Sequence, residues 1–376
     1  MLVFEGASAS VSGLLDGRTP LETARCSASA YVAERGRSGL LKPYPDMARA
    51  RSVIGLATLL GFSSKEAKTL QPGPLSLADS TDADPYDLVF CACFVNTDGE
   101  HLLAPRIALS LDETRELVDA LQRSCGDLEV TLKVTSPGQF LVVMHHFRVS
   151  ATEGQPPWHP ASTRIDANWP YARDDRRLES FRNITEEVLA SHAVNEVRID
   201  LGEIPANGVW LWGGGHMPGD FSGRPFPDRT ACISDSPMAR GLARKLDMEV
   251  ESFTSSSFAE VFERNIIGRN HLLIVSSAEA QGNARSRVQH LDHVDFHIIR
   301  PVVEYLKAWK DLRIALVSNG AVDADTGKPL ATKTPVVLYE PSADADASRR
   351  WSEGEARQGK AGSLTASNLF EFFRKG

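Results

Sequence analysis

The sequence has few cysteines and no long apolar run, and each shortage excludes a class of protein. The five cysteines are scattered, odd in number and free of any C-x-x-C pair, so no disulfide framework is indicated and a reducing compartment is expected. No segment approaches the roughly 20 apolar residues of a membrane-spanning helix. Residues 1–8 also lack the basic start and apolar centre of a secretion signal. We therefore expect a cytoplasmic protein that makes no membrane contact.

An excess of basic charge is also missing. Lysine and arginine number 41 against 49 aspartate and glutamate residues, and the resulting net charge of -8 argues against nucleic acid as a partner. The remaining composition, 42% hydrophobic and 24% charged, is that of an ordinary soluble globule. Because 376 residues are long for one domain and comfortable for two, a two-domain globular protein is expected.

Short apolar runs alternate with helical segments in the second half of the chain and predict an α/β domain. The run 2–4 and the runs that begin at 209, 271 and 313 read as strands, with helical segments between the later ones. Such alternation is typical of a doubly wound, mainly parallel sheet with both faces covered. Ligands of these sheets bind beyond the carboxyl ends of the strands. One common site is therefore expected to be faced by Glu5, Gly213, Ser276 and the loop after Val317.

The character of the sequence changes near residues 71–74 (QPGP), and the segment that follows predicts a separate domain. The runs 88–95, 128–134 and 140–143 read as strands, and 111–123 reads as a helix that Ser110 caps. This order suggests a small α+β layer. We therefore predict a core domain of residues 1–72 and 201–376 with an inserted cap domain of residues 73–200. In this arrangement Trp210 and Trp212 lie on a buried strand of the core sheet.

Four segments stand out in order along the chain: 14–24 (LLDGRTPLETA), 59–62 (LLGF), 192–198 (HAVNEVR) and 206–215 (ANGVWLWGGG). They resemble motifs of the archaeal-type cofactor-independent phosphoglycerate mutases, members of the alkaline phosphatase superfamily. The resemblance implies an alkaline-phosphatase-like doubly wound fold with an inserted α+β cap, and the isomerisation of 3- and 2-phosphoglycerate. It also implies a serine held between two divalent ions of manganese, magnesium or zinc, which lower the serine pKa and neutralise the phosphoryl oxygens.

The same resemblance places ligand contacts in the two later segments. The triple glycine permits close approach of the backbone to a ligand, and it could equally serve a tight turn. It is not a dinucleotide fingerprint, because the G-x-G-x-x-G spacing is absent. Arg182 is a further candidate anion contact, although an arginine on a surface helix is usually solvated. The resemblance implies that a small acidic or phosphorylated ligand contacts His192, Asn195, Arg198, Gly213, Gly214 and Gly215.

The sequence departs from the family at the positions that carry the chemistry. Ser52 stands at the position of the nucleophile, although a lone serine at a helix start is usually a cap. Glu5 replaces a metal-binding aspartate, and Glu279 is the one acid in a loop where the family carries an aspartate and a histidine. Ser318 and Asn319 stand where the family carries Asp-His. Glu5 and Glu279 are thus the residual metal positions.

These few donors cannot hold two divalent ions, so we predict no metal cofactor and no mutase activity. The leading hypothesis is a catalytically degenerate homologue that binds a small acidic ligand or a protein partner. One alternative is an active metal-dependent phosphotransferase or phosphomutase with an altered ligand set. Another is a related enzyme that acts on a different substrate without metal.

A histidine cluster offers one replacement ligand set. His290, His293 and His297 share one face of an expected helix over 287–307, at i, i+3 and i+7 spacing, and could hold a transition metal. The apolar stripe of this helix lies elsewhere, so solvated histidines are the alternative. Whether the three side chains compensate for the missing ligands stays open from the sequence.

Overall fold

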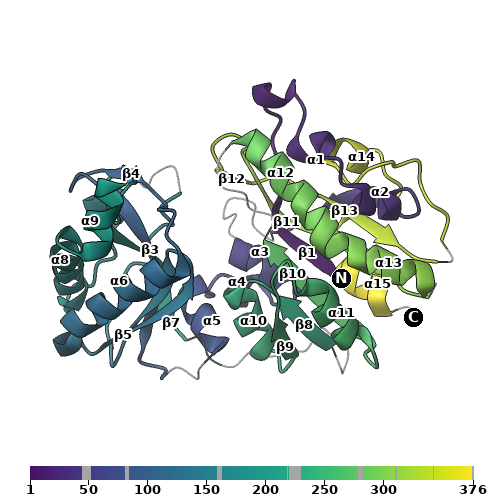
Figure 1. Ribbon diagram of the computed structural model, residues 1–376. Coiled ribbons are helices and arrows are strands. Elements are labelled where there is room, and N and C mark those ends of the chain that lie inside the picture. The colour runs from purple at the N-terminus through teal and green to yellow at the C-terminus, as the bar shows by residue number, and fades with distance from the viewer. Residues whose placement is uncertain are drawn as a thin grey trace. The chain divides into compact units, whose positions relative to one another are not determined.

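The computed structural model describes residues 1–44, 52–80, 84–158, 163–217, 219, 230–277, 283–309, 311–341 and 343–374. The chain forms two compact units (Figure 1). Met1–Leu70 and Phe221–Gly376 form the core unit, and Gln71–Asp220 form the inserted unit. One continuous segment thus provides the inserted unit, between the two segments of the core unit.

The core unit is built on a nine-stranded sheet of order β14-β2-β13-β11-β1-β10-β8-β9, with β12 paired to β11. β1 lies between β10 and β11 and is parallel to both, and the parallel series continues through β8 and β9. β13 is antiparallel to β11 and β2, so the sheet is mainly parallel, which confirms the predicted fold class. The strands are β1 Leu2–Ala9, β2 Arg37–Leu41, β8 Thr230–Ser234, β9 Glu249–Ser252, β10 His271–Ser277, β11 Ile314–Val322, β12 Pro329–Leu330, β13 Thr334–Tyr339 and β14 Gly362–Leu364.

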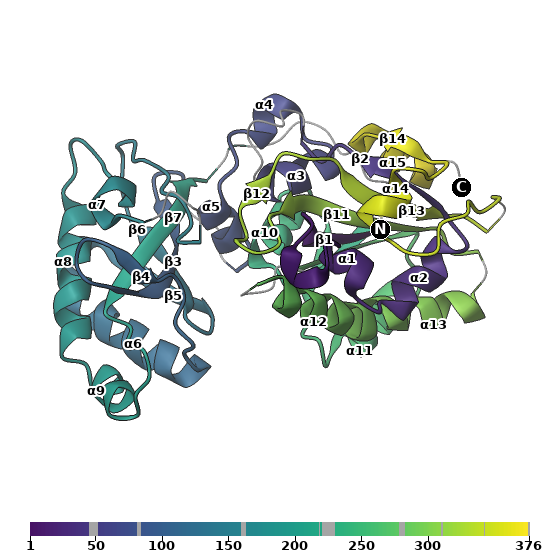
Figure 2. The ribbon, with the colours of Figure 1, turned by 90° about the horizontal axis from the view of Figure 1, so that it is seen from above.

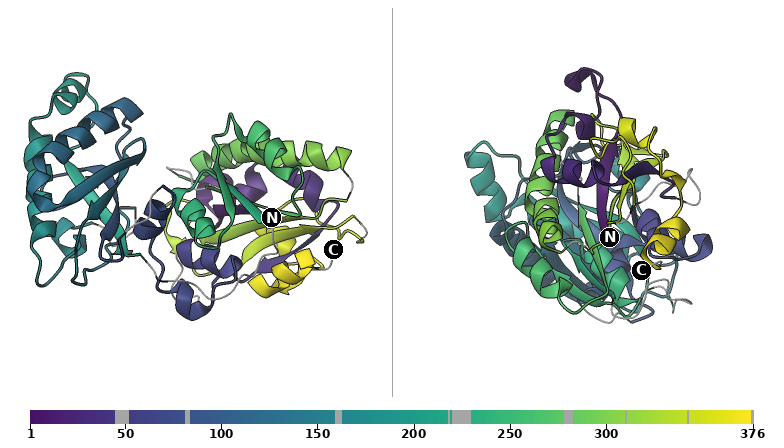
Figure 3. Two further views of the ribbon diagram at one scale, coloured as in Figure 1. Left: turned by 90° about the horizontal axis from the view of Figure 1, so that it is seen from below. Right: turned by 90° about the vertical axis from the view of Figure 1, so that its right-hand side faces the viewer.

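Helices cover both faces of the core sheet. Figures 2 and 3 show α11, α12 and α13 on one face and α3 and α15 on the other. Because both faces are covered, every residue of β1 is buried. No described helix is long and apolar enough to span a bilayer. The helices of this unit are α1 Pro20–Thr23, α2 Ser27–Ala33, α3 Ser52–Leu59, α4 Ser64–Ala67, α10 Pro237–Arg244, α11 Phe258–Ile266, α12 Ala284–Val294, α13 Arg300–Ala308, α14 Glu353–Ala356 and α15 Ala366–Arg374, with a π-helical turn Asp295–Ile299 between α12 and α13.

The inserted unit is an antiparallel sheet of order β4-β3-β6-β5, with β7 paired to β3, packed against helices. The predicted helix start at Ser110 is confirmed: its side chain accepts from the Glu113 amide, and the Glu113 carboxylate accepts from the Ser110 amide. The elements are α5 Pro72–Ala78, β3 Leu88–Thr97, β4 Leu102–Ala104, α6 Leu111–Ser124, β5 Val130–Ser136, β6 Gln139–Met144, α7 Ile165–Asn168, α8 Arg177–Ala190, α9 Ala193–Asp200 and β7 Gly208–His216.

β7 corrects the prediction for Trp210 and Trp212. It is not a strand of the core sheet, because it pairs antiparallel with β3 of the inserted unit, and this places Gly213 in the inserted unit as well. The division between units therefore falls near residue 220, whereas the sequence had suggested 200. Both indoles are buried as predicted, at 2% and 8% exposure. A strand that is buried on both faces has the same apolar sequence pattern in the core sheet and in the sheet of the inserted unit. The pattern alone therefore could not predict which strand β7 pairs with.

Candidate functional site

The carboxyl edge of the core sheet brings together residues from three neighbouring strands. In the register of β1, Glu5 lies opposite Ser277 of β10 on one side and opposite Asn319 of β11 on the other. Ser52 begins α3, and its carbonyl oxygen accepts a hydrogen bond from Asn319 Nδ2 at 3.0 Å. Glu5 is 7% exposed and Asn319 1%. We call these four residues the strand-end cluster.

The side chains of Ser318 and Asn319 serve the local fold. The Ser318 hydroxyl accepts from the Ser8 amide at 2.9 Å and donates to the Gly320 carbonyl at 3.0 Å. Within the described residues, Asn319 Oδ1 is buried and receives no hydrogen bond. A Cβ on Gly55 would lie 2.1 Å from that oxygen, so α3 approaches it closely because residue 55 is glycine.

Asp235 lies at the same edge, directly after β8, and was not singled out from the sequence. Its carboxylate accepts from the Ser276 hydroxyl at 2.6 Å and from the Ser277 amide at 3.2 Å. Desolvation raises the pKa of Asp235, although part of the residue reaches the surface, and the Arg240 guanidinium opposes that rise. The signal that could have found it is its position, an acid immediately after a predicted parallel strand.

The described residues do not fit a pair of divalent ions. Such ions require about six or more hard ligands between them. In the described part of the chain, no three His, Cys, Asp or Glu side chains are grouped so that they could hold a metal ion. The strand-end cluster supplies one carboxylate, one amide and two serines. Glu279 lies outside the described residues.

The three histidines do lie on one helical face. His290 and His293 are on α12 and His297 is on the π-helical turn, with the rings of His293 and His297 4.3 Å apart. His293 Nε2 is 3.0 Å from the Ser255 hydroxyl, and His290 Nε2 is 3.3 Å from the Ser277 carbonyl. Desolvation, with the neighbouring His297 and His290, lowers the pKa of His293. The sequence left open whether these histidines compensate for the missing ligands, and in the described structure they do not form a group that could hold a metal ion.

His192, Asn195 and Arg198 are held by internal contacts of the inserted unit. His192 caps α9 by accepting from the Val194 amide, and the Asn195 amide group exchanges hydrogen bonds with the backbone of Ala206. Arg198 is 5% exposed and donates to Glu113 Oε1 at 2.8 Å. These contacts explain the three residues as supports for α9. Their predicted contact with a ligand stays a prediction.

Two of the three glycines after Trp212 are required by packing within the inserted unit. Gly213 has a φ of 59°, and a Cβ on it would lie 2.9 Å from the Pro72 ring. A Cβ on Gly214 would lie 1.9 Å from the Phe90 ring, and one on Gly215 would lie 3.0 Å from the side chain of Gln71. Close approach by protein atoms therefore accounts for Gly213 and Gly214, whereas the Gln71 side chain could move away from a Cβ on Gly215. Contact of the three glycines with a ligand stays a prediction.

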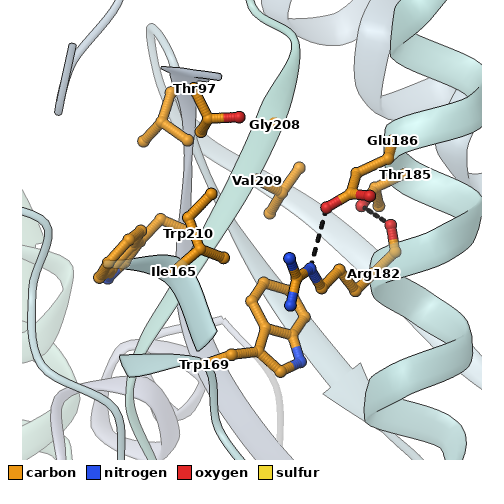
Figure 4. A pocket seen from close by; sticks show the side chains of 10 residues that line it. Thr97, Ile165, Trp169, Arg182, Thr185, Glu186, Gly208, Val209 and Trp210 are labelled. Atoms are coloured by element: carbon orange, nitrogen blue, oxygen red, sulfur yellow. Dashed lines mark hydrogen bonds and ion pairs between the residues drawn. The ribbon is translucent and has the colours of Figure 1, made fainter. Parts of the chain in front are cut away.

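Arg182 lines a small pocket of the inserted unit, shown in Figure 4. The guanidinium donates to Glu186 at 2.9 Å and to Asp166 at 2.7 Å, and it lies over the Trp169 ring. The cavity is about 10 Å³, which is space for about one water molecule. Arg182 is thus neutralised by two carboxylates beside a cavity too small for a phosphorylated metabolite.

Comparison with known proteins agrees with this architecture. Two solved structures share the fold: the PH0037 protein from Pyrococcus horikoshii (TM-score 0.71, 18% identity, 100% of this chain and 97% of that one) and the cofactor-independent phosphoglycerate mutase from Thermoplasma acidophilum (TM-score 0.53, 22% identity, 100% and 98%). The class defined by these likenesses is therefore a two-unit α/β fold, which the chain shares with a cofactor-independent phosphoglycerate mutase.

Sequence comparison finds similar proteins in one family. Residues 33–195 match the family described as 2,3-bisphosphoglycerate-independent phosphoglycerate mutase. The mutase of that name from Methanosarcina barkeri is 25% identical over 378 residues, covering 94% of both chains. A probable mutase from Geobacter sulfurreducens is 26% identical over 90% of both chains. These relatives are cofactor-independent phosphoglycerate mutases, the family that the motifs of this chain resemble.

Proposed function

We propose that this chain is a catalytically degenerate, metal-free homologue of the phosphoglycerate mutases that acts by binding a ligand or partner. The observation that supports this most directly is the use of Ser318 and Asn319. At these positions the resembled motif carries two metal ligands, whereas here the side chains bond to Ser8, Gly320 and Ser52. A position engaged in such bonds contributes to the fold and offers no charge to a cation.

The state of Ser52 follows from the same argument. A serine hydroxyl attacks a phosphoryl group only when a base, a lowered pKa or a metal activates it. The Ser52 carbonyl is held by Asn319, and the strand-end cluster of described residues, whose one charged group is the acid Glu5, does not provide the positive charge that would stabilise an alkoxide. The remaining function is recognition, of a small acidic or phosphorylated ligand or of a protein.

A coupled mutase assay tests the proposal. Wild-type protein, Ser52→Ala and the control Ser64→Ala, an exposed serine of α4, are assayed with excess manganese, magnesium or zinc. We expect no turnover above the buffer blank in any of them, and less than one metal equivalent in protein purified without chelator. Turnover that Ser52→Ala abolishes and Ser64→Ala retains would establish the active, altered-ligand enzyme instead.

A further inference from the structure

A groove on the core unit, between α11 and α13, is lined by aromatic and charged side chains. Its volume is about 490 Å³. Ala259 and Glu263 of α11 form one wall, and Phe296, Arg300 and Tyr305 lie along the other. Aromatic and arginine side chains of this kind are enriched in protein interfaces and among the residues that dominate their binding energy.

The aromatic wall is held firmly although much of it is exposed. Phe296 is 55% exposed in the π-helical turn, and the Arg300 guanidinium lies over its ring at 5.0 Å. Trp309 lies beside the groove and not in its lining; it is 63% exposed and stacks on the lining residue Tyr305 at 5.8 Å. Tyr305 in turn meets the buried Phe262 edge-on at 5.5 Å. Exposed rings supported in this way form a preorganised contact surface.

The charges of the two walls identify the occupant. Glu263 stands on the α11 wall and Arg300 on the α13 wall, and within the described residues neither forms an ion pair, since Arg300 instead lies over the Phe296 ring at 5.0 Å. Glu304 is already paired with Lys307 at 3.0 Å. A surface with one unpaired charge of each sign is complementary to itself about a two-fold axis.

We infer that this groove is the interface between two copies of the chain. Glu263 of one copy faces the partner subunit's Arg300, and the two-fold axis repeats the contact, while the aromatic walls pack between these pairs. The net charge of -8 per chain repels a second copy. The two ion pairs oppose this repulsion locally and fix the relative position of the two copies. The inference is independent of the proposed function, because the groove contains no residue of the strand-end cluster.

Sedimentation velocity of the full chain, over about 1–100 μM, measures the association. We expect wild type to reach twice the chain mass, and Phe296→Glu and Trp309→Glu each to weaken dimerisation by at least about tenfold. Leu103→Glu, at a residue of the inserted unit that is 60% exposed, is the matched control and should associate like wild type. Circular dichroism verifies that each variant is folded.

A charge exchange makes the test specific. Glu263→Arg and Arg300→Glu alone each create two like-charge contacts across the axis and should weaken the dimer, whereas the double variant should restore it. A wild type that stays monomeric throughout, or a dimer insensitive to the groove substitutions, would overturn the inference. A dimer that both single exchanges weaken and the double exchange does not restore would overturn the assigned pairing and with it the proposed geometry.

Discussion

Substitution of Glu353, a buried carboxylate of the core unit, is expected to separate the contribution of hydrogen bonding from that of charge. The residue is 7% exposed. Its Oε1 accepts from the Ser8 hydroxyl at 2.8 Å and from the Ala9 amide at 3.0 Å, and its Oε2 accepts from the Thr19 hydroxyl at 2.7 Å. One carboxylate thus joins α14 to the end of β1 and to the beginning of α1.

The magnitude follows from the three donors. Glu353→Ala leaves the two hydroxyls and the amide without this acceptor, and each unsatisfied buried donor costs about 1–3 kcal/mol. Because the two hydroxyls can partly reorient, we expect the free energy of unfolding to fall by about 3–5 kcal/mol. Glu353→Gln keeps one carbonyl oxygen for Ser8 and Ala9, while its amide can donate to the Thr19 hydroxyl. Because the glutamine carries no charge to desolvate, we expect it to lose less than about 1.5 kcal/mol.

The dependence on pH distinguishes wild type from Glu353→Gln. Desolvation raises the pKa of Glu353 above its ordinary value of 4.5, against the donated hydrogen bonds that lower it. The folded chain therefore holds this proton more tightly than the unfolded chain. The stability due to this group is present below pH 4.5 and is lost as the pH rises through the raised pKa. The glutamine variant should consequently improve relative to wild type as the pH rises towards neutrality.

Urea unfolding followed by circular dichroism, at neutral and at acid pH, measures both effects. Glu355→Ala, on the same helix and less buried, is the control and should change the free energy of unfolding by less than about 1 kcal/mol. A loss below about 1 kcal/mol for Glu353→Ala would refute the hydrogen-bonding argument. A glutamine variant as unstable as the alanine variant would refute the argument from charge.

Two further predictions concern the inserted unit. Gly214→Ala should lower the stability of the inserted unit by about 1–3 kcal/mol in thermal unfolding, because the added Cβ would lie only 1.9 Å from the Phe90 ring. Gly13→Ala of the core unit, with no neighbouring atom within 4 Å, should be tolerated and serves as the control. Arg198→Ala should cost about 1–3 kcal/mol in urea unfolding, since it removes the buried donor to Glu113 and to the Ile204 carbonyl, and Arg198→Lys should recover only part of this. A loss below about 1 kcal/mol for Arg198→Ala would show that this contact is not structural.

Local signals in the sequence predicted most of the elements. The helix start at Ser110 depends on a pairing with Glu113 three residues later, so a short stretch of sequence contains all of it. The runs expected to begin at residues 271 and 313 correspond to β10 and β11, which begin within one residue of those positions. Apolar runs of this length, alternating with helices, left few alternatives to a mainly parallel sheet.

Contacts between distant segments could not be predicted in this way. Asp235 binds Ser276 and Ser277, which are 41 and 42 residues away, and Glu353 binds residues more than 330 positions away. Such contacts depend on strand order and register, which the amino-acid pattern of a single strand does not encode. The same limit explains β7, whose apolar run was assigned to the wrong sheet.

The bonds at Ser318, beside the strand-end cluster, bear on the proposal that the chain binds no metal. Ser318 Oγ accepts from the Ser8 amide and donates to the Gly320 carbonyl, so one hydroxyl performs both roles. An aspartate at this position could accept from the amide but would have no proton for the carbonyl, and two oxygens at that distance repel each other. Asn319 Nδ2 likewise holds the beginning of α3 through the Ser52 carbonyl. Ser318→Asp or Asn319→His alone would therefore remove a buried hydrogen bond without creating a metal site, because one ligand does not make a site.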